Sequence, residues 1–206
     1  LIPYFAEQPN VLLELKTKSD CVDSLLDLDP KGRVVVAWSM NPQTVIALDE
    51  ADTASLSERL NAARRCQEAG YRLGFHFDPM IEYPGWEADY ESMLEELFAT
   101  IDWRKLSWLS LGVLRNTPGL KRAMRERFPR TQLLTGEQVI CPDGKLRYFQ
   151  PLRVEMYRKM VGWIRRAAPT VKIYLCMESK EVWQQVFGFA PACEKELGNQ
   201  LGNLGF

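Results

Sequence analysis

The chain has 206 residues, of which 46% are apolar and 11% aromatic, and this composition excludes a disordered chain. The formal net charge of −1 excludes binding to nucleic acid through overall charge alone, so any such site must be a local patch. No apolar run is long enough to predict a membrane span.

Strands and helices alternate along the first half of the chain. In chain order we expect a strand at Val11–Thr17, a short helix at Asp20–Leu28 capped by Asp20, a strand at Arg33–Ser39, a short helix at Asn41–Leu48, a helix at Ser55–Ala69, a strand at Tyr71–Phe77 and a helix at Trp86–Ile101. The fifth of these is the best marked, because Ser55 and Glu58 form a capping box and Gly70 supplies a stop.

The alternation continues in the second half. We expect a strand at Leu106–Leu114, a helix from Thr117 to Phe128 with Pro118 in its first position, a short strand at Thr131–Leu134, a hairpin at Gln138–Phe149, a helix at Leu152–Ala168, a strand at Val171–Cys176 and a helix at Lys180–Phe187. The pattern predicts an α/β fold with a parallel sheet covered by helices. The strands are too few for a closed eight-stranded barrel, so Val11–Thr17 should have an unpaired edge.

Polar residues follow the ends of these strands, where parallel α/β folds bind ligands. They are Lys18, Ser39, Asn41, His76, Asp78, Arg115, Cys176 and Glu178. Each also has a structural interpretation, such as a solvated charge, a helix cap or a packed imidazole. No glycine-rich phosphate loop accompanies them, which argues against a dinucleotide-binding fold.

Basic and aromatic side chains alternate in the predicted hairpin. Lys145, Arg147 and Tyr148 could contact phosphates or bases, and Arg115, at the end of the fourth strand, is a further candidate for substrate binding. The alternative is an ordinary hairpin that covers the end of the sheet.

The five cysteines are widely spaced and form no motif with metal-ligand spacing. We therefore expect reduced thiols in a cytoplasmic protein and no metal site in this chain. The first residues lack both an initiator Met and the basic start of a signal peptide, which suggests a processed chain or a fragment.

Several stretches resemble spore photoproduct lyases and their relatives, in register over roughly residues 10–135. They are VLLELKTKSDCVDSLLDL, RVVVAWSMNPQTVI, SLSERLNAARRCQEAGYRLGFHFDP, GWEADY, LEELFATIDWRKL and KRAMRERFPRTQL, followed later by YLCMES and KEVWQQVFG. The resemblance implies an open partial (β/α) barrel of the radical S-adenosylmethionine (AdoMet) type. In that family a [4Fe–4S] cluster cleaves AdoMet to a radical that starts the reversal of a thymine lesion in DNA.

Carried over by position, Lys18 and Ser39 match family residues that contact AdoMet. Asn41 lies beside them, and Asp78 stands where the family tends to have alanine. The resemblance thus implies AdoMet and a [4Fe–4S] cluster as cofactors and UV-damaged DNA as partner. The cluster's CxxxCxxC loop and the hydrogen-donor cysteine would lie upstream of Leu1, and the hairpin is shorter than in the family. No residue is assigned a catalytic role.

We therefore expect the later part of a radical AdoMet barrel at residues 1–135, a hairpin at 136–151, a helix–strand–helix extension at 152–190 and a tail at 191–206. Such a chain would be inactive alone and would act in DNA repair within a longer protein. Three alternatives stay open: a radical AdoMet enzyme with another substrate, a non-catalytic binding or scaffold domain, and a hydrolase or lyase that uses His76, Asp78 and Glu178.

Overall fold

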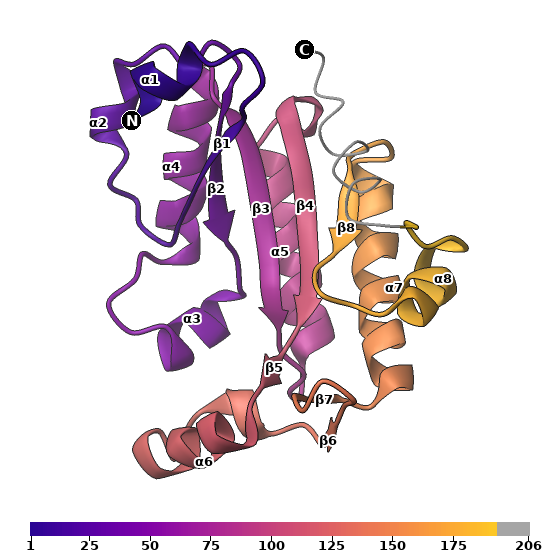
Figure 1. Cartoon of the computed structure of the whole chain (residues 1–206). Coiled ribbons are helices and arrows are strands. Elements are labelled where there is room, and N and C mark those ends of the chain that lie inside the picture. Colours follow the sequence, from indigo (N-terminus) through magenta and orange to yellow (C-terminus); the bar gives the residue numbers. More distant parts are fainter. Residues whose placement is uncertain (193–206) are drawn as a thin grey trace.

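The computed structural model describes residues 1–192, and its centre is a parallel sheet of five strands in the order β1-β2-β3-β4-β8 (Figure 1). The strands are β1 (Leu13–Thr17), β2 (Val34–Ser39), β3 (Arg72–Met80), β4 (Leu106–Val113) and β8 (Ile173–Leu175). β1 pairs with β2 alone among the described strands, so it lies at an edge of the sheet, as predicted. The fold is the predicted α/β class, an open parallel sheet with outer helices.

Eight helices and two 3-10 turns connect the strands in the described part of the chain. The helices are α1 (Ile2–Ala6), α2 (Asp23–Leu26), α3 (Gln43–Asp49), α4 (Leu56–Glu68), α5 (Trp86–Thr100), α6 (Pro118–Arg127), α7 (Gln150–Ala167) and α8 (Lys180–Phe187). The 3-10 turns are η1 (Trp103–Lys105) and η2 (Gln132–Leu134).

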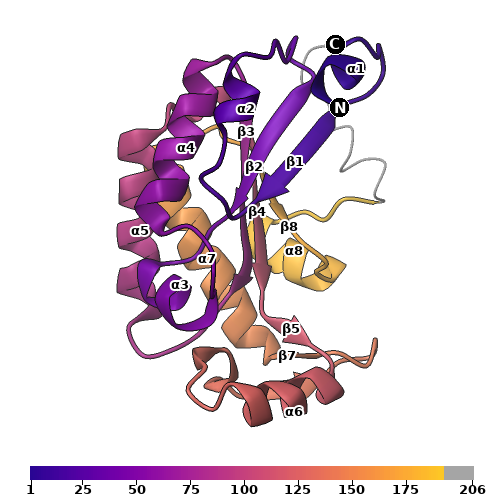
Figure 2. The same ribbon diagram turned by 90° about the vertical axis from the view of Figure 1, so that its left-hand side faces the viewer.

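The two faces of the sheet differ in chemistry because side chains alternate along each strand. Helices α4, α5 and α7 lie along one face (Figure 2), where Val36, Trp38 and Phe75 belong to the buried apolar cluster. Glu14, Ser39 and His76 point to the opposite face, which we call the polar face. Burial of the first face supplies most of the driving force for folding.

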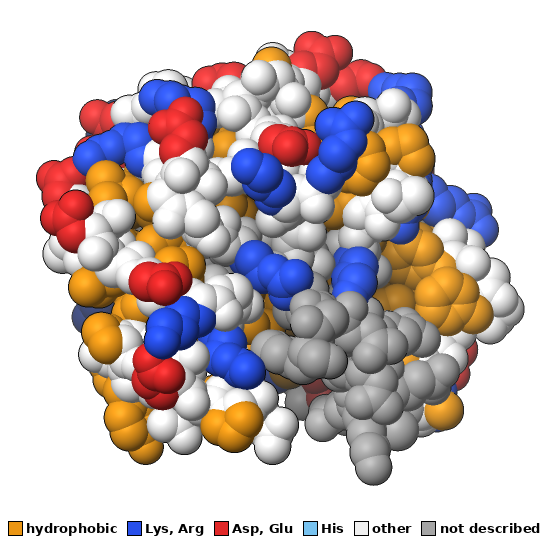
Figure 3. Space-filling model, turned by 90° about the horizontal axis from the view of Figure 1, so that it is seen from above, with side chains coloured by type: hydrophobic (Ala, Val, Ile, Leu, Met, Phe, Trp, Pro, Cys, Tyr) orange, Lys and Arg blue, Asp and Glu red, His pale blue; other side chains and the backbone are white. Residues whose placement is uncertain are grey.

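A small antiparallel sheet lies at the carboxyl end of the main strands (Figure 1). It consists of β5 (Arg115–Asn116), β7 (Leu146–Tyr148) and β6 (Gln138–Ile140) in that order. β6 and β7 form the predicted hairpin, and β5 joins it directly after β4. The end at which the strands begin carries a mixture of basic and acidic side chains (Figure 3), and several form pairs there, including Arg65 with Asp23 and Arg64 with Glu68.

Three buried tyrosines complete the hydrogen bonding where β3 and β4 end. The hydroxyls of Tyr90 and Tyr148 accept the N–H groups of Ile81 and Glu82, at 3.0 and 3.1 Å, just after β3. Tyr157 accepts the N–H of Val113, the last residue of β4, at 2.9 Å. Burial raises the pKa of all three phenols, which therefore stay protonated.

Some predictions from the sequence are wrong at the ends and between the main elements. Thr131–Leu134 is no strand, because the Thr131 hydroxyl accepts the N–H of Leu133 and closes the turn η2. Asp20 does not cap a helix; α2 begins after Val22 without a side-chain cap. The division of the chain into parts stays a prediction; α7 spans its expected boundary between 151 and 152, and β8 pairs with β4 in the main sheet. The predicted tail lies outside the described residues from 193 onward.

Candidate functional site

Lys18 and Asn41 come from the ends of adjacent strands and meet at one carboxylate. The Lys18 ammonium and the Asn41 amide both donate to Oε1 of Glu50, each at 2.9 Å. The other oxygen of Glu50 accepts from Arg59 at 2.6 Å. Two of the predicted cofactor residues are thus neighbours at the carboxyl end of the sheet.

Ser39 lies beside this group without a direct side-chain contact to it. Arg59 is fully buried in α4, and its guanidinium donates to the backbone carbonyl of Ser39 at 2.9 Å and to the hydroxyl of Thr53 at 2.7 Å. Ser39 itself is buried at the end of β2, opposite His76 of β3. We call Lys18, Asn41, Glu50 and Arg59 the Glu50 network.

The charge of Glu50 is stabilised by its partners. Burial raises the pKa of this carboxyl, but hydrogen bonds from Asn41, Lys18 and Arg59 outweigh burial and leave the pKa below its ordinary value. Our sequence reasoning missed Glu50 and Arg59. Arg59 did leave a signal, because it is a charged residue among the buried apolar positions of α4, next to Leu56 and Leu60.

A second ion pair lies where β3 and β4 end. The guanidinium of Arg115 donates to both oxygens of Asp78 at 3.1 and 3.2 Å, and to the sulfur of Cys176 at 3.8 Å. The Asp78 carboxylate covers Gly112, where an added Cβ would approach to 2.7 Å. Burial and Asp78 raise the pKa of the Cys176 thiol to about 11, so the sulfur stays protonated. Asp78, Arg115 and Cys176 therefore form one cluster, apart from the Glu50 network.

The hairpin residues predicted to bind substrate have mostly internal partners. Arg147 is buried and makes two hydrogen bonds to the carboxylate of Asp143, at 2.7 and 2.8 Å. Tyr148 is fully buried and completes the end of β3. Lys145 is half-buried at the turn between β6 and β7. Their contact with substrate stays a prediction, and the geometry leaves Lys145 the most accessible of the three.

The residues of the hydrolase alternative are held by separate partners. His76 lies 2.6 Å from Glu14 across the polar face, between Nε2 and Oε1. Glu178 accepts from Tyr157 at 2.9 Å and from Arg153 at 3.1 Å, and Asp78 pairs with Arg115. Each side chain thus has its own internal partner.

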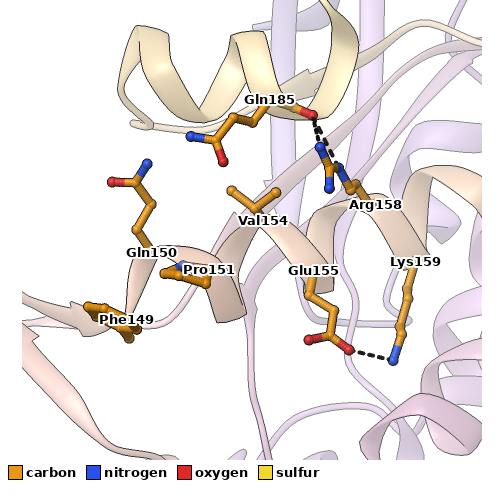
Figure 4. A pocket seen from close by; sticks show the side chains of 8 residues that line it. All are labelled: Phe149, Gln150, Pro151, Val154, Glu155, Arg158, Lys159 and Gln185. Atoms are coloured by element: carbon orange, nitrogen blue, oxygen red, sulfur yellow. Dashed lines mark hydrogen bonds and ion pairs between the residues drawn. The ribbon is translucent and has the colours of Figure 1, made fainter.

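A cavity of about 870 Å³ lies between α7 and α8 (Figure 4). None of the predicted site residues lines it, and its two basic groups are already paired, because Arg158 donates to the carbonyl of Gln185 and Lys159 contacts Glu155. A second cavity of about 600 Å³ lies beside the hairpin and includes Arg147 and Glu178 in its wall.

Residues 1–192 contain no group of three His, Cys, Asp or Glu side chains that could hold a metal ion. Their four cysteines, Cys21, Cys66, Cys141 and Cys176, form no disulfide with one another. None of the helices in this range is both long and apolar enough to cross a membrane.

Comparison with known proteins gives one consistent result. The family model described as spore photoproduct lyase matches residues 1–147. The spore photoproduct lyase of Geobacillus sp. (strain Y412MC61) is 36% identical over 123 residues, which are 59% of this chain and 36% of that protein. That of Bacillus subtilis (strain 168) is 33% identical over 139 residues, which are 66% of this chain and 41% of that protein. The chain therefore spans well under half the length of these relatives.

Solved structures give the same result at the level of the fold. A spore photoproduct lyase complexed with dinucleoside spore photoproduct is 29% identical, with a TM-score of 0.75 over 85% of this chain and 54% of that one. A mutant spore photoproduct lyase with bound AdoMet and dinucleoside spore photoproduct has the same identity and coverage, with a TM-score of 0.76.

Proposed function

The chain belongs to the spore photoproduct lyase family, and from this premise we propose that it is the AdoMet-binding part of a DNA repair enzyme that reverses UV-induced thymine lesions. The observation that carries the proposal is the meeting of Lys18 and Asn41 at the carboxyl end of the sheet. It occurs in a chain whose fold matches a relative with AdoMet bound. The proposed place of action is the cytoplasm.

The donor groups at the strand ends fit AdoMet. Its carboxylate needs a cation, and the Lys18 side chain is 40% exposed and pairs within residues 1–192 with Glu50 alone. Its hydroxyl and amino groups need polar partners, and we propose Ser39 on the polar face as one of them. Asp78 is the other candidate, and it would have to share its carboxylate with Arg115. When bound, AdoMet would supply the radical that begins the reaction.

The described residues do not fit a [4Fe–4S] cluster. Such a cluster needs cysteine thiolates close together, whereas Cys66 is buried and Cys176 is engaged by Arg115. Burial raises the pKa of the Cys66 thiol to about 11, which disfavours the thiolate. In our proposal the cluster ligands come from a part of the protein outside residues 1–192, and we derive no step through the cluster.

A related enzyme with another substrate is the second candidate. The pair of Asp78 and Arg115 favours it, because this pair places two opposite charges at the end of β3, beside the proposed AdoMet position. Repair of UV-irradiated oligonucleotides by the full-length reconstituted protein separates the two. Conversion of the thymine lesion supports the first candidate. AdoMet cleavage without any conversion supports the second.

The binding proposal is tested by Lys18→Ala, with Lys105→Ala as the matched control. Lys105 is an exposed lysine in η1, at the opposite end of the sheet. Loss of a charge-assisted contact costs about 1.5–3 kcal/mol, or about ten- to a hundredfold in affinity. Calorimetric titration of AdoMet into reconstituted full-length protein should show this loss for Lys18→Ala alone, with iron content unchanged in both variants. Equal affinity of wild type and Lys18→Ala would reject the proposed site.

A further inference from the structure

Helix α6 and the residues after it concentrate positive charge in a chain that is nearly neutral overall. Residues 121–130 carry five cations and one carboxylate, against a formal net charge of −1 for the whole chain. The cations are Lys121, Arg122, Arg125, Arg127 and Arg130.

These cations have no carboxylate partner within residues 1–192, unlike the arginines of the two clusters described above. At the opposite end of the molecule, basic side chains alternate with acidic ones (Figure 3), and pairs such as Arg65 with Asp23 form there. The charge of α6 is thus unbalanced locally, which makes this surface attractive to an anion.

The stability of α6 does not explain why positive charges gather in residues 121–130. Arg125 and Arg127 lie in the last turn, where the helix dipole favours cations, but Lys121 lies near the first turn, where the dipole disfavours them. Lys121 and Arg125 are four residues apart, a spacing at which like charges repel on a helix. An external partner of opposite charge would relieve this repulsion.

The segment is fixed to the rim of the sheet at both ends although none of the α6 side chains is buried. At its beginning, Thr117 caps the helix directly after β5, which carries Arg115. At its end, the N–H of Gln132 donates to Asp49, next to Glu50, at 3.1 Å. The helix therefore lies at the carboxyl end of the sheet (Figures 1 and 2), held beside both polar clusters.

A small cavity beside the helix adds an aromatic surface to the charge. It has a volume of about 300 Å³, and Arg125, Phe128, Pro129 and Thr131 are among the residues that line it. The Phe128 side chain is 62% exposed, so its ring is accessible to a partner. Cations next to an exposed aromatic ring are typical of surfaces that follow a nucleic-acid strand.

We propose that α6 and residues 128–130 bind the phosphodiester backbone of DNA next to the lesion, with Arg122 and Arg125 as phosphate contacts. This inference rests on the proposed function for the identity of the anion. It also resolves a difficulty, because Arg115 and Arg147 are already paired with carboxylates and are poor candidates for that contact.

The test is the double variant Arg122→Ala/Arg125→Ala in the full chain, with binding to a short fluorescent duplex measured by anisotropy. Two lost phosphate contacts should lower the slope of log K against log salt by about 2. We expect affinity to fall by about tenfold, equal to about 1.4 kcal/mol. Arg104→Ala/Lys105→Ala removes the same charge from the opposite end of the sheet and should leave the slope unchanged. Arg122→Lys/Arg125→Lys should retain most of the affinity.

Other outcomes overturn the inference. Equal losses for the two alanine pairs would show that total charge is what matters, and an unchanged slope for the α6 pair would show that it makes no phosphate contact. Competition by polyglutamate as strong as by DNA would point to an acidic protein instead. AdoMet titration of the wild type and of the same α6 variant separates the two proposals. If the variant binds both AdoMet and DNA as the wild type does, this inference alone is rejected. If the wild type fails to bind AdoMet, the proposed function is rejected.

Discussion

Replacing Glu50 by Gln should destabilise the fold far more than a typical surface change. The carboxylate and the Arg59 guanidinium are 6% and 0% exposed, so the substitution leaves a buried cation without its counter-charge. Breaking a buried pair in this way costs about 3–5 kcal/mol. Gln keeps one oxygen for Lys18 and Asn41, and we therefore expect a loss near the lower limit, about 3 kcal/mol.

The control substitution, Glu68→Gln, lies on α4, the helix that carries Arg59. Arg64 and Glu68 form an exposed pair at 2.5 Å, four residues apart, with side chains that are 45% and 61% exposed. Because exposed pairs contribute about 0–1 kcal/mol, Glu68→Gln should cost less than about 1 kcal/mol. Urea unfolding measures both variants, and an unchanged m-value would show that the effect lies in stability. If Glu50→Gln and Glu68→Gln cost the same, Glu50 does not neutralise Arg59 in the way we infer.

The loss of stability caused by Glu50→Gln should depend on pH. The pKa of Glu50 is lower in the folded protein than its ordinary value of 4.5, so its contribution is complete above that pH and is lost as the pH falls through the folded pKa. The difference between wild type and Glu50→Gln should therefore shrink below pH 4.5. A difference that stays constant into acid would contradict this assignment.

Two further predictions concern the polar face and the core. Gly112→Ala should lower stability by about 1–3 kcal/mol, because its Cβ would lie 2.7 Å from the Asp78 carboxylate. This loss should disappear when Asp78 is also replaced by Ala. Thermal unfolding of the single and double variants measures both effects. At pH 8 a thiol reagent should label exposed Cys21 well before buried Cys66, whose pKa is raised to about 11. Peptide mass spectrometry follows the two sites, and equal labelling rates in the native protein would be inconsistent with the described core.

The sequence predicted those elements whose signals are local. The capping box of Ser55 and Glu58 and the cap at Thr117 both form as expected, because each depends on residues within one helical turn. The apolar residues of Thr131–Leu134 suggested a strand, but the contact of Gln132 with Asp49, far away in sequence, favours a turn. Contacts of this kind are outside the range of periodicity and capping rules.

The candidate site was predictable in its location but not in its partners. The rule that ligands bind at strand ends correctly indicated that Lys18 and Asn41 would be close together. It gave no indication that Glu50, from the loop after α3, would join them. Arg147 looked available for DNA because its alternation with aromatic residues suggested an exposed face. The turn of the hairpin brings Asp143 against it instead.

The three tyrosines that accept the last N–H groups of β3 and β4 have a consequence for how this fold can change. They satisfy the last N–H groups of the strands with uncharged phenols, whereas the residues that we propose to meet a ligand at the same end, such as Lys18, are charged. In our proposal the frame and the recognition of a ligand thus depend mainly on different residues, with Tyr90 joining the two through its hydrogen bond to Asn41 at 2.9 Å. Substitutions among the charged residues can alter what the protein accepts while Tyr90, Tyr148 and Tyr157 preserve the frame, which is a route by which one architecture acquires new substrates.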